Sequence, residues 1–233
     1  MGEGSPFVEA FRMLGSLDAR LLEVVGLSLG VSAAATALAV MFGLPAALGL
    51  SLARFPGRRG LRALVRSLMM VPAVLIGLVI YLLLGRGGLL GALELLYTPW
   101  AIVVAQALLA LPLVTALFVA ALEGVDPLLL DAVRTGGGGP WWTARAAVRQ
   151  AAPPLFAAAL TAFARVVGET GMTMMVGGNI LGQTRTMTTA IATEAMRGEF
   201  EVALALGVVL LALSILVNVV LLLLEPRADA RAR

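Results

Sequence analysis

The sequence contains no cysteine, no histidine and no lysine, and only 13% of its 233 residues are charged. The missing cysteine and histidine exclude disulfides, metal sites built on either residue, thiol nucleophiles and imidazole acid–base chemistry. Without lysine, the chain cannot contain the phosphate loop Gly-x-x-x-x-Gly-Lys-Ser/Thr, which binds nucleotides in many ATPases. The chain therefore lacks this type of nucleotide-binding site.

Apolar residues are abundant instead: 60% of the sequence is hydrophobic, and its mean hydropathy is +0.98. A soluble domain of this length has too little interior to bury so much apolar surface. In a bilayer, lipid tails solvate those side chains. The sequence therefore predicts an integral membrane protein. Its net charge of +3 then reflects arginines that set topology and does not indicate nucleic-acid binding.

Long apolar runs predict the membrane spans, each of which needs ~20 mostly apolar residues. The runs lack the period-2 alternation of a barrel, so we expect helices. Pro45, Pro72 and Pro112 fall inside three of the runs, where we expect kinks rather than breaks. The expected fold is all-α, with about five transmembrane helices, at Val24–Ala53, Leu64–Leu84, Ala101–Leu122, Pro154–Val176 and Val202–Leu224.

Residues 1–23 differ from these runs because charged side chains, among them Glu9, Arg12 and Asp18, interrupt their apolar residues. A signal peptide would need an uninterrupted apolar stretch after a basic start. We therefore expect an N-terminal amphipathic helix at the membrane surface. Residues 24–224 would form the transmembrane domain, and residues 225–233 a cytoplasmic tail.

The arginines predict the orientation. Eleven of them fall on one side of the expected spans, in the loop 54–66, the segment after the third span and the tail. Five fall on the other side, and Arg165 lies within a span. Positively charged loops stay in the cytoplasm. The count therefore places the C-terminus in the cytoplasm and the N-terminus outside.

The longest polar interval between spans, residues 123–153, predicts two short cytoplasmic helices. Asp126 is suited to cap the first helix, with Pro127 at its first position. The glycines 136–139 would end that helix, since glycine adopts left-handed conformations freely. Pro140 would begin the second. A plain connecting loop, with Trp141 and Trp142 at the membrane interface, is the alternative.

The first of these helices resembles the cytoplasmic Glu-Ala-Ala-x-x-x-Gly motif of ABC importer permeases. Residues 131–137 read Asp-Ala-Val-Arg-Thr-Gly-Gly, with aspartate and valine in place of the glutamate and the second alanine. In that family the motif forms a coupling helix that docks into a groove on the ATPase subunit. The resemblance implies an ATPase-coupling role for five residues: Asp131, Ala132, Val133, Gly137 and Pro140.

Other stretches resemble permeases that import oxyanions such as molybdate, sulfate and tungstate. Residues 163–171 (Phe-Ala-Arg-Val-Val-Gly-Glu-Thr-Gly) match a span of that group, and residues 96–106 and 174–191 are closest to its tungstate-type members. The likeness extends in one order from about Phe7 to Leu224. It implies the type I, molybdate-permease-like importer fold.

The same resemblance implies an assembly in the prokaryotic plasma membrane. This chain would form a homodimer that binds two cytoplasmic ATPase subunits and an extracytoplasmic anion-binding protein. ATP and magnesium would bind to the ATPase subunits, so we expect no cofactor or metal on this chain. The expected function is that of an oxyanion permease, for tungstate before molybdate or sulfate.

Two charged residues interrupt the fourth expected span. Arg165 and Glu169 are one helical turn apart, and a charge near mid-membrane costs ~2.5–3.5 kcal/mol on insertion scales. They could neutralise each other at a dimer interface or make gating contacts. Arg165 could instead line the anion path, since a guanidinium suits a tetrahedral oxyanion. Thr173 and Asn179 are further candidates for this path or gate, and Asn179 belongs to a polar turn that could receive the anion or merely reverse the chain.

Two other classes of function compete with an ATP-driven importer. A secondary transporter would work without an ATPase, but usually has more spans and paired broken helices. An intramembrane enzyme would need a nucleophile with a base, a metal site or paired carboxylates. Glu169 is the only acidic residue deep within an expected span, so the sequence favours the importer.

Overall fold

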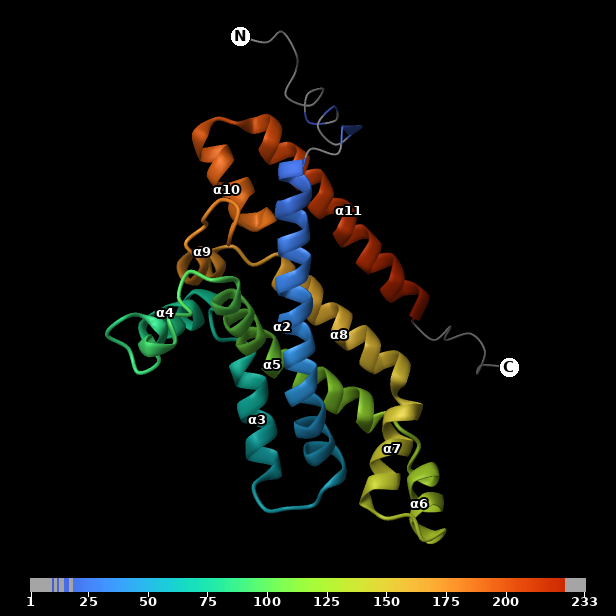
Figure 1. Cartoon of the computed structure of the whole chain (residues 1–233). Helices are drawn as coiled ribbons and strands as arrows, with labels where there is room; N and C mark the ends of the chain where they lie inside the picture. Colours follow the sequence, from blue (N-terminus) through green and yellow to red (C-terminus); the bar gives the residue numbers. More distant parts are fainter. Residues whose placement is uncertain (1–9, 11, 13–14, 17–18, 225–233) are drawn as a thin grey trace.

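The computed structural model describes residues 10, 12, 15–16 and 19–224 (Figure 1). No strand occurs in this part of the chain, which confirms the all-α prediction. Its elements are α2 (Ala19–Leu52), α3 (Arg58–Leu68), α4 (Ala73–Leu84), the 3-10 turn η1 (Gly91–Leu93), α5 (Pro99–Glu123), α6 (Pro127–Thr135), α7 (Pro140–Gln150), α8 (Ala152–Val167), α9 (Gly171–Gly177), α10 (Met187–Arg197) and α11 (Phe200–Leu224).

Three helices, α2, α5 and α11, are each long and apolar enough to cross a bilayer, as the first, third and fifth runs predict. The buried residues of α2 recur at intervals of three and four, so that one face of the helix packs inward. Helix α5 begins directly after Thr98, whose hydroxyl accepts a hydrogen bond from the N–H of Ala101. Pro45 and Pro112 lie inside α2 and α5, as expected.

The second run does not form one helix, so the prediction for Pro72 is wrong. The run is divided into α3 and α4, which meet at 93°. Pro72 is the residue that precedes α4. Proline disfavours helical conformation in the residue before it and lacks an N–H to continue the preceding helix. The proline therefore marks a corner rather than a kink.

The fourth run is also interrupted. Helix α8 ends at Val167 and α9 begins at Gly171, so residues 168–170 are a break in the expected span Pro154–Val176. At its other end α8 meets α7 at 71°. Counting each bent pair, α3–α4 and α7–α8, as one span gives up to five spans in the described residues.

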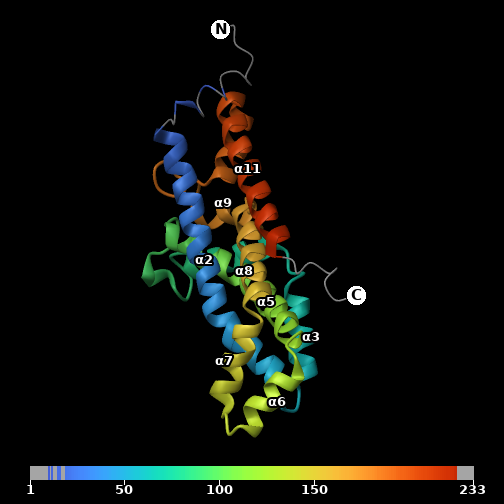
Figure 2. The same cartoon turned by 90° about the vertical axis from the view of Figure 1, so that its right-hand side faces the viewer.

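Helix α5 lies at the centre of the bundle and packs against α2 and α8 (Figure 1). In its most apolar 18-residue stretch, 56% of the residues are buried, compared with 11% in that of α11. Gly43 allows α2 to approach α5 closely, because a Cβ there would lie only 3.0 Å from Cγ1 of Val114 in α5. Figure 2 shows α8 between α2 and α11. The bundle centre is therefore filled, whereas few residues of α11 are buried.

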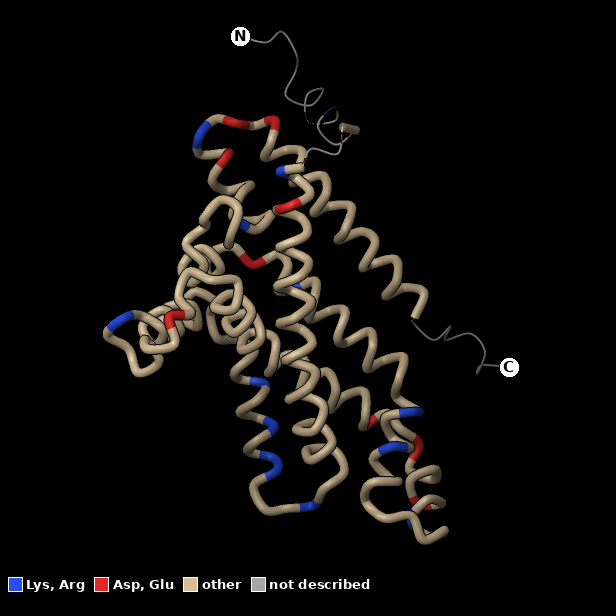
Figure 3. Tube along the Cα trace, viewed as in Figure 1, with Lys and Arg blue, Asp and Glu red and all other residues tan. Residues whose placement is uncertain are grey.

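Basic residues gather at one end of the bundle, on α3 and around α6 and α7 (Figure 3). Two of them fasten the end of α2. Arg58 donates to the carbonyls of Leu50 and Ser51 at 2.5 and 2.6 Å, and Arg62 also donates to Leu50. These bonds satisfy carbonyls that the last turn of a helix leaves free.

The two terminal predictions lie largely outside the described residues. Within the predicted surface helix of residues 1–23, residues 19–23 form the first turn of α2. The predicted tail, residues 225–233, lies entirely outside the described part of the chain.

Candidate functional site

The break between α8 and α9 carries the charged pair that the sequence singles out. Arg165 Nη1 donates to Glu169 Oε2 at 2.9 Å, although Glu169 lies beyond the end of α8. The Glu169 side chain is 11% exposed and that of Arg165 is 48% exposed. The carboxylate is therefore held inside the bundle, while the guanidinium lies between its partner and the surface.

Side chains from other helices satisfy the backbone of the break. The carbonyl of Val166 accepts hydrogen bonds from the Glu169 N–H and from Nε2 of Gln106 in α5, both at 3.1 Å. The carbonyl of Glu169 accepts one from the Thr188 hydroxyl in α10, at 2.9 Å. Sequence reasoning assigned no role to Gln106 or Thr188. For Gln106 the available signal was a lone amide within an apolar run.

Thr173 and Asn179 are not joined to the charged pair. Thr173 lies in α9, and its buried hydroxyl has no hydrogen-bond partner in the described structure. Asn179 follows α9 in a left-handed conformation, with φ of 50°, and donates to the Thr193 hydroxyl in α10 at 2.7 Å. Of the four predicted path or gate residues, the structure therefore brings only Arg165 and Glu169 together.

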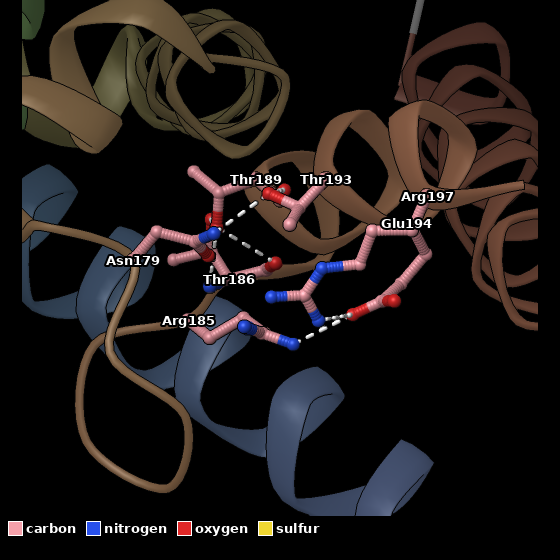
Figure 4. Close-up of polar contacts among 7 residues, drawn as sticks. All are labelled: Asn179, Arg185, Thr186, Thr189, Thr193, Glu194 and Arg197. Atoms are coloured by element: carbon pink, nitrogen blue, oxygen red, sulfur yellow. Dashed lines mark hydrogen bonds and ion pairs between the residues drawn. The ribbon is translucent and has the colours of Figure 1, made fainter. Parts of the chain in front are cut away.

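The turn that follows Asn179 is fastened to α10 (Figure 4). Glu194 Oε1 accepts from Arg185 Nη1 at 2.6 Å and lies 3.6 Å from Arg197 Nη1. Thr186 caps α10, and its N–H bonds to the hydroxyl of Thr189 at 2.9 Å. A short helix, α10, therefore follows the turn and precedes α11. Sequence reasoning missed the Arg185–Glu194 ion pair, because the two residues are nine positions apart and lie in different elements.

A cavity of about 390 Å³ adjoins this turn, between the start of α2, α10 and the start of α11. Three arginines and two glutamates contribute to its lining: Arg20, Arg185, Arg197, Glu194 and Glu199. Since both signs of charge are present, the lining does not select anions by charge alone.

The two short helices predicted in residues 123–153 are present as α6 and α7. Asp126 caps α6, accepting from the N–H of Leu128 at 2.9 Å, and Pro140 is the first residue of α7. Gly137 has φ of +82°. The N–H groups of Gly137 and Gly138 bond back to the carbonyls of Arg134 and Val133, which completes a Schellman motif with glycine at its left-handed position.

The predicted coupling residues, Asp131, Ala132, Val133, Gly137 and Pro140, all belong to this α6–α7 projection. None of the residues of α6 is buried. Large apolar side chains are exposed there: Leu128, Trp141 and Trp142 are 76%, 72% and 58% exposed. Arg145 lies over the Trp142 ring, 5.8 Å from its centroid. Exposed apolar residues on a polar projection are typical of a protein-binding surface.

Comparison with known proteins gives a consistent result. A family model described as "Binding-protein-dependent transport system inner membrane component" matches residues 39–230. The chain is 39% identical to a probable anion ABC transporter permease protein of Haloferax volcanii, over 88% of this chain and 91% of that protein. It is 36% identical to the tungstate uptake system permease protein of Peptoclostridium acidaminophilum, over 94% and 96%. It is 34% identical to the molybdenum transport system permease protein of Escherichia coli K12, over 73% and 78%.

Solved structures confirm the type I permease fold. The inward-facing MetNI methionine ABC transporter matches with a TM-score of 0.67 and 18% identity, over 88% of this chain and 96% of that one. A bacterial alginate ABC transporter matches with a TM-score of 0.65 and 15% identity, over 96% and 81%. At these identities the likeness establishes the fold and not the cargo.

Proposed function

This chain belongs to the inner membrane components of binding-protein-dependent transport systems, and we propose that it is the permease subunit of an ATP-driven importer for tungstate. One observation carries the proposed cargo: the 36% identity to a tungstate uptake permease covers 94% of this chain. The match to the molybdenum permease covers 73% of it. Tungstate and molybdate are tetrahedral oxyanions of the same charge, so molybdate is the competing cargo.

The α6–α7 projection supports an ATPase partner. The chain has no lysine and hence no phosphate loop of its own. A short helix that ends in a fixed glycine turn, with Leu128, Trp141 and Trp142 exposed beside it, offers a compact apolar surface for docking. In this proposal the five coupling residues transmit motion from the ATPase and do not touch the anion.

Packing within the bundle supports a homodimer. Buried apolar side chains pack around α5, which favours a passage outside the core of a single copy. Exposed apolar residues on α4, among them Val74, Leu75, Leu78 and Leu82, leave a face that lipid or a second copy would cover. We infer that the passage lies between two copies, with the α8–α9 break beside it.

The distribution of charge supports the orientation. The end that carries α3, α6 and α7 holds most of the described arginines (Figure 3). The positive-inside rule places that end in the cytoplasm. The turn before α10 and the adjoining cavity would then face the extracytoplasmic binding protein, and Arg165 and Glu169 would lie on the route between the two ends.

Uptake by a strain that lacks this chain tests the proposal. We expect loss of high-affinity tungstate accumulation, retention of sulfate uptake, and restoration of tungstate uptake by the wild-type chain. If tungstate accumulation is unchanged while molybdate uptake is lost, the cargo is molybdate. If uptake of all three oxyanions is unchanged, the proposed function is wrong.

A further inference from the structure

Gln106 differs from the other buried polar residues of its helix. It is 2% exposed, and the oxygen and the nitrogen of its side-chain amide each form a hydrogen bond with another helix. Its Oε1 accepts from the Ser32 hydroxyl of α2 at 3.2 Å, and its Nε2 donates to the Val166 carbonyl of α8 at 3.1 Å. Thr115, also in α5 and 4% exposed, bonds only to the Leu111 carbonyl of its own helix. Gln106 therefore joins three helices, whereas Thr115 joins none.

The carbonyl to which Gln106 donates lies at the end of α8, beside the break. Val166 is the next-to-last residue of α8, adjacent to Arg165 and one residue before the break at 168–170 begins. The Glu169 N–H also donates to this carbonyl from within the break, so Gln106 supplies its hydrogen bond to another helix. Backbone polar groups in an apolar environment need such partners, and this one ties the end of α8 to α5. The Thr188 hydroxyl of α10 donates to the carbonyl of Glu169, which lies within the break.

Helix α8 also forms the covalent connection between the α6–α7 projection and the break, since α7 leads into it through Ala151 alone. A displacement of α6 and α7 can therefore reach residues 168–170 along α8. At that end, the Gln106–Val166 hydrogen bond ties α8 to α5, and the Ser32–Gln106 bond extends the tie to α2.

We propose that Gln106 is a positioning residue for transport: it fixes the end of α8 so that motion of the α6–α7 projection changes the geometry of the break and of the Arg165–Glu169 pair. Gln106 does not contact the anion in this account and acts through the Val166 carbonyl. The inference rests on the proposed function, because it concerns how ATPase motion reaches the anion path.

The first test measures tungstate ions imported per ATP hydrolysed by the complete complex in proteoliposomes. Measuring the ratio on the purified, assembled complex removes differences in protein yield. Gln106→Leu removes the side-chain bond from α5 to the Val166 carbonyl, which keeps its bond from the Glu169 N–H, and leaves Ser32 without its acceptor. We expect the ratio to fall about tenfold. Thr115→Val is the matched control, and its ratio should stay within about twofold of wild type, since the lost bond lies within one helix.

A milder variant keeps the test decisive if Gln106→Leu does not insert. Ser32→Ala removes the bond that orients the amide but spares the bond to Val166, and should lower the ratio by about two- to threefold. An unchanged ratio in Gln106→Leu, or in Ser32→Ala if Gln106→Leu fails to insert, overturns the inference. An equal fall in Thr115→Val also overturns it. A wild-type complex without ATP-driven tungstate uptake would contradict the proposed function instead.

The second test uses single cysteines, which the chain otherwise lacks. Thr170 lies in the break and is half-buried, whereas Ala164 is exposed on α8. In the Gln106→Leu background, a maleimide should modify Thr170→Cys about tenfold faster, while Ala164→Cys changes by less than about twofold. Equal acceleration at both positions would indicate general loosening of the bundle and would overturn the positioning role.

Discussion

Replacing Gly137 tests whether the turn between α6 and α7 transmits ATPase motion. Gly137 has φ of +82°, and a Cβ there would have no atom within 4 Å, so conformation and not crowding limits the substitution. A non-glycine residue in the left-handed region costs ~1–2 kcal/mol. That cost corresponds to roughly a tenfold fall in the population of the native turn, because 1.4 kcal/mol is a factor of about ten. Asparagine tolerates this region better than alanine, and valine tolerates it least.

Gly139 provides the matched control in the same glycine run. It is equally exposed, its φ is −70°, and a Cβ there would also have no atom within 4 Å. Gly138 is unsuitable, because a Cβ there would lie 2.6 Å from the Val133 carbonyl oxygen. Alanine at 137 should therefore disturb the turn, and alanine at 139 should not.

The assay is binding of the ATPase subunit to the purified permease, followed by coupled tungstate uptake in proteoliposomes. We expect Gly137→Ala to weaken ATPase binding about tenfold, Gly137→Val more, and Gly139→Ala less than about twofold. The affinity of the separate binding protein for its anion should not change. Normal coupled transport by a correctly inserted Gly137→Val protein would refute the docking role, as would equal defects at 137 and 139.

Two further predictions concern the charged pair and the topology. Arg165→Gln should lower tungstate uptake below the wild-type level, because it leaves the mostly buried Glu169 without its ion-pair partner. If the pair is only structural, adding Glu169→Gln restores uptake. If Arg165 contacts the anion, uptake by the double variant stays low. For topology, a membrane-impermeant thiol reagent outside intact cells should label Met196→Cys, 76% exposed in α10, and spare Leu128→Cys, 76% exposed in α6; the opposite labelling would reverse the orientation.

The sequence predicts the α6–α7 projection well because its signals are local. Asp126 and Pro127 start one helix, the glycine run ends it, and Pro140 starts the next, all through bonds between residues a few positions apart. The long helices α2, α5 and α11 follow equally directly from hydropathy, since each is a continuous apolar run longer than a bilayer requires.

The interruptions could not be predicted in the same way. Hydropathy over residues 64–84 does not reveal the 93° corner at Pro72, because the residues on both sides of the corner are mostly apolar. The break at 168–170 depends on donors distant in the sequence: Gln106 lies 60 positions before Val166, and Thr188 lies 19 positions after Glu169. No local pattern identifies those partners.

The charged pair shows how a correct prediction can rest on incomplete geometry. The spacing of Arg165 and Glu169 predicts a contact on one face of a continuous helix, and the contact exists at 2.9 Å. The helix, however, ends between them, so their ion pair spans the end of α8 and the start of the break. The pair therefore links α8 directly to the break. Neutralisation, gating and anion contact are alternatives for this pair, and uptake by Arg165→Gln with and without Glu169→Gln distinguishes a structural pair from an anion contact.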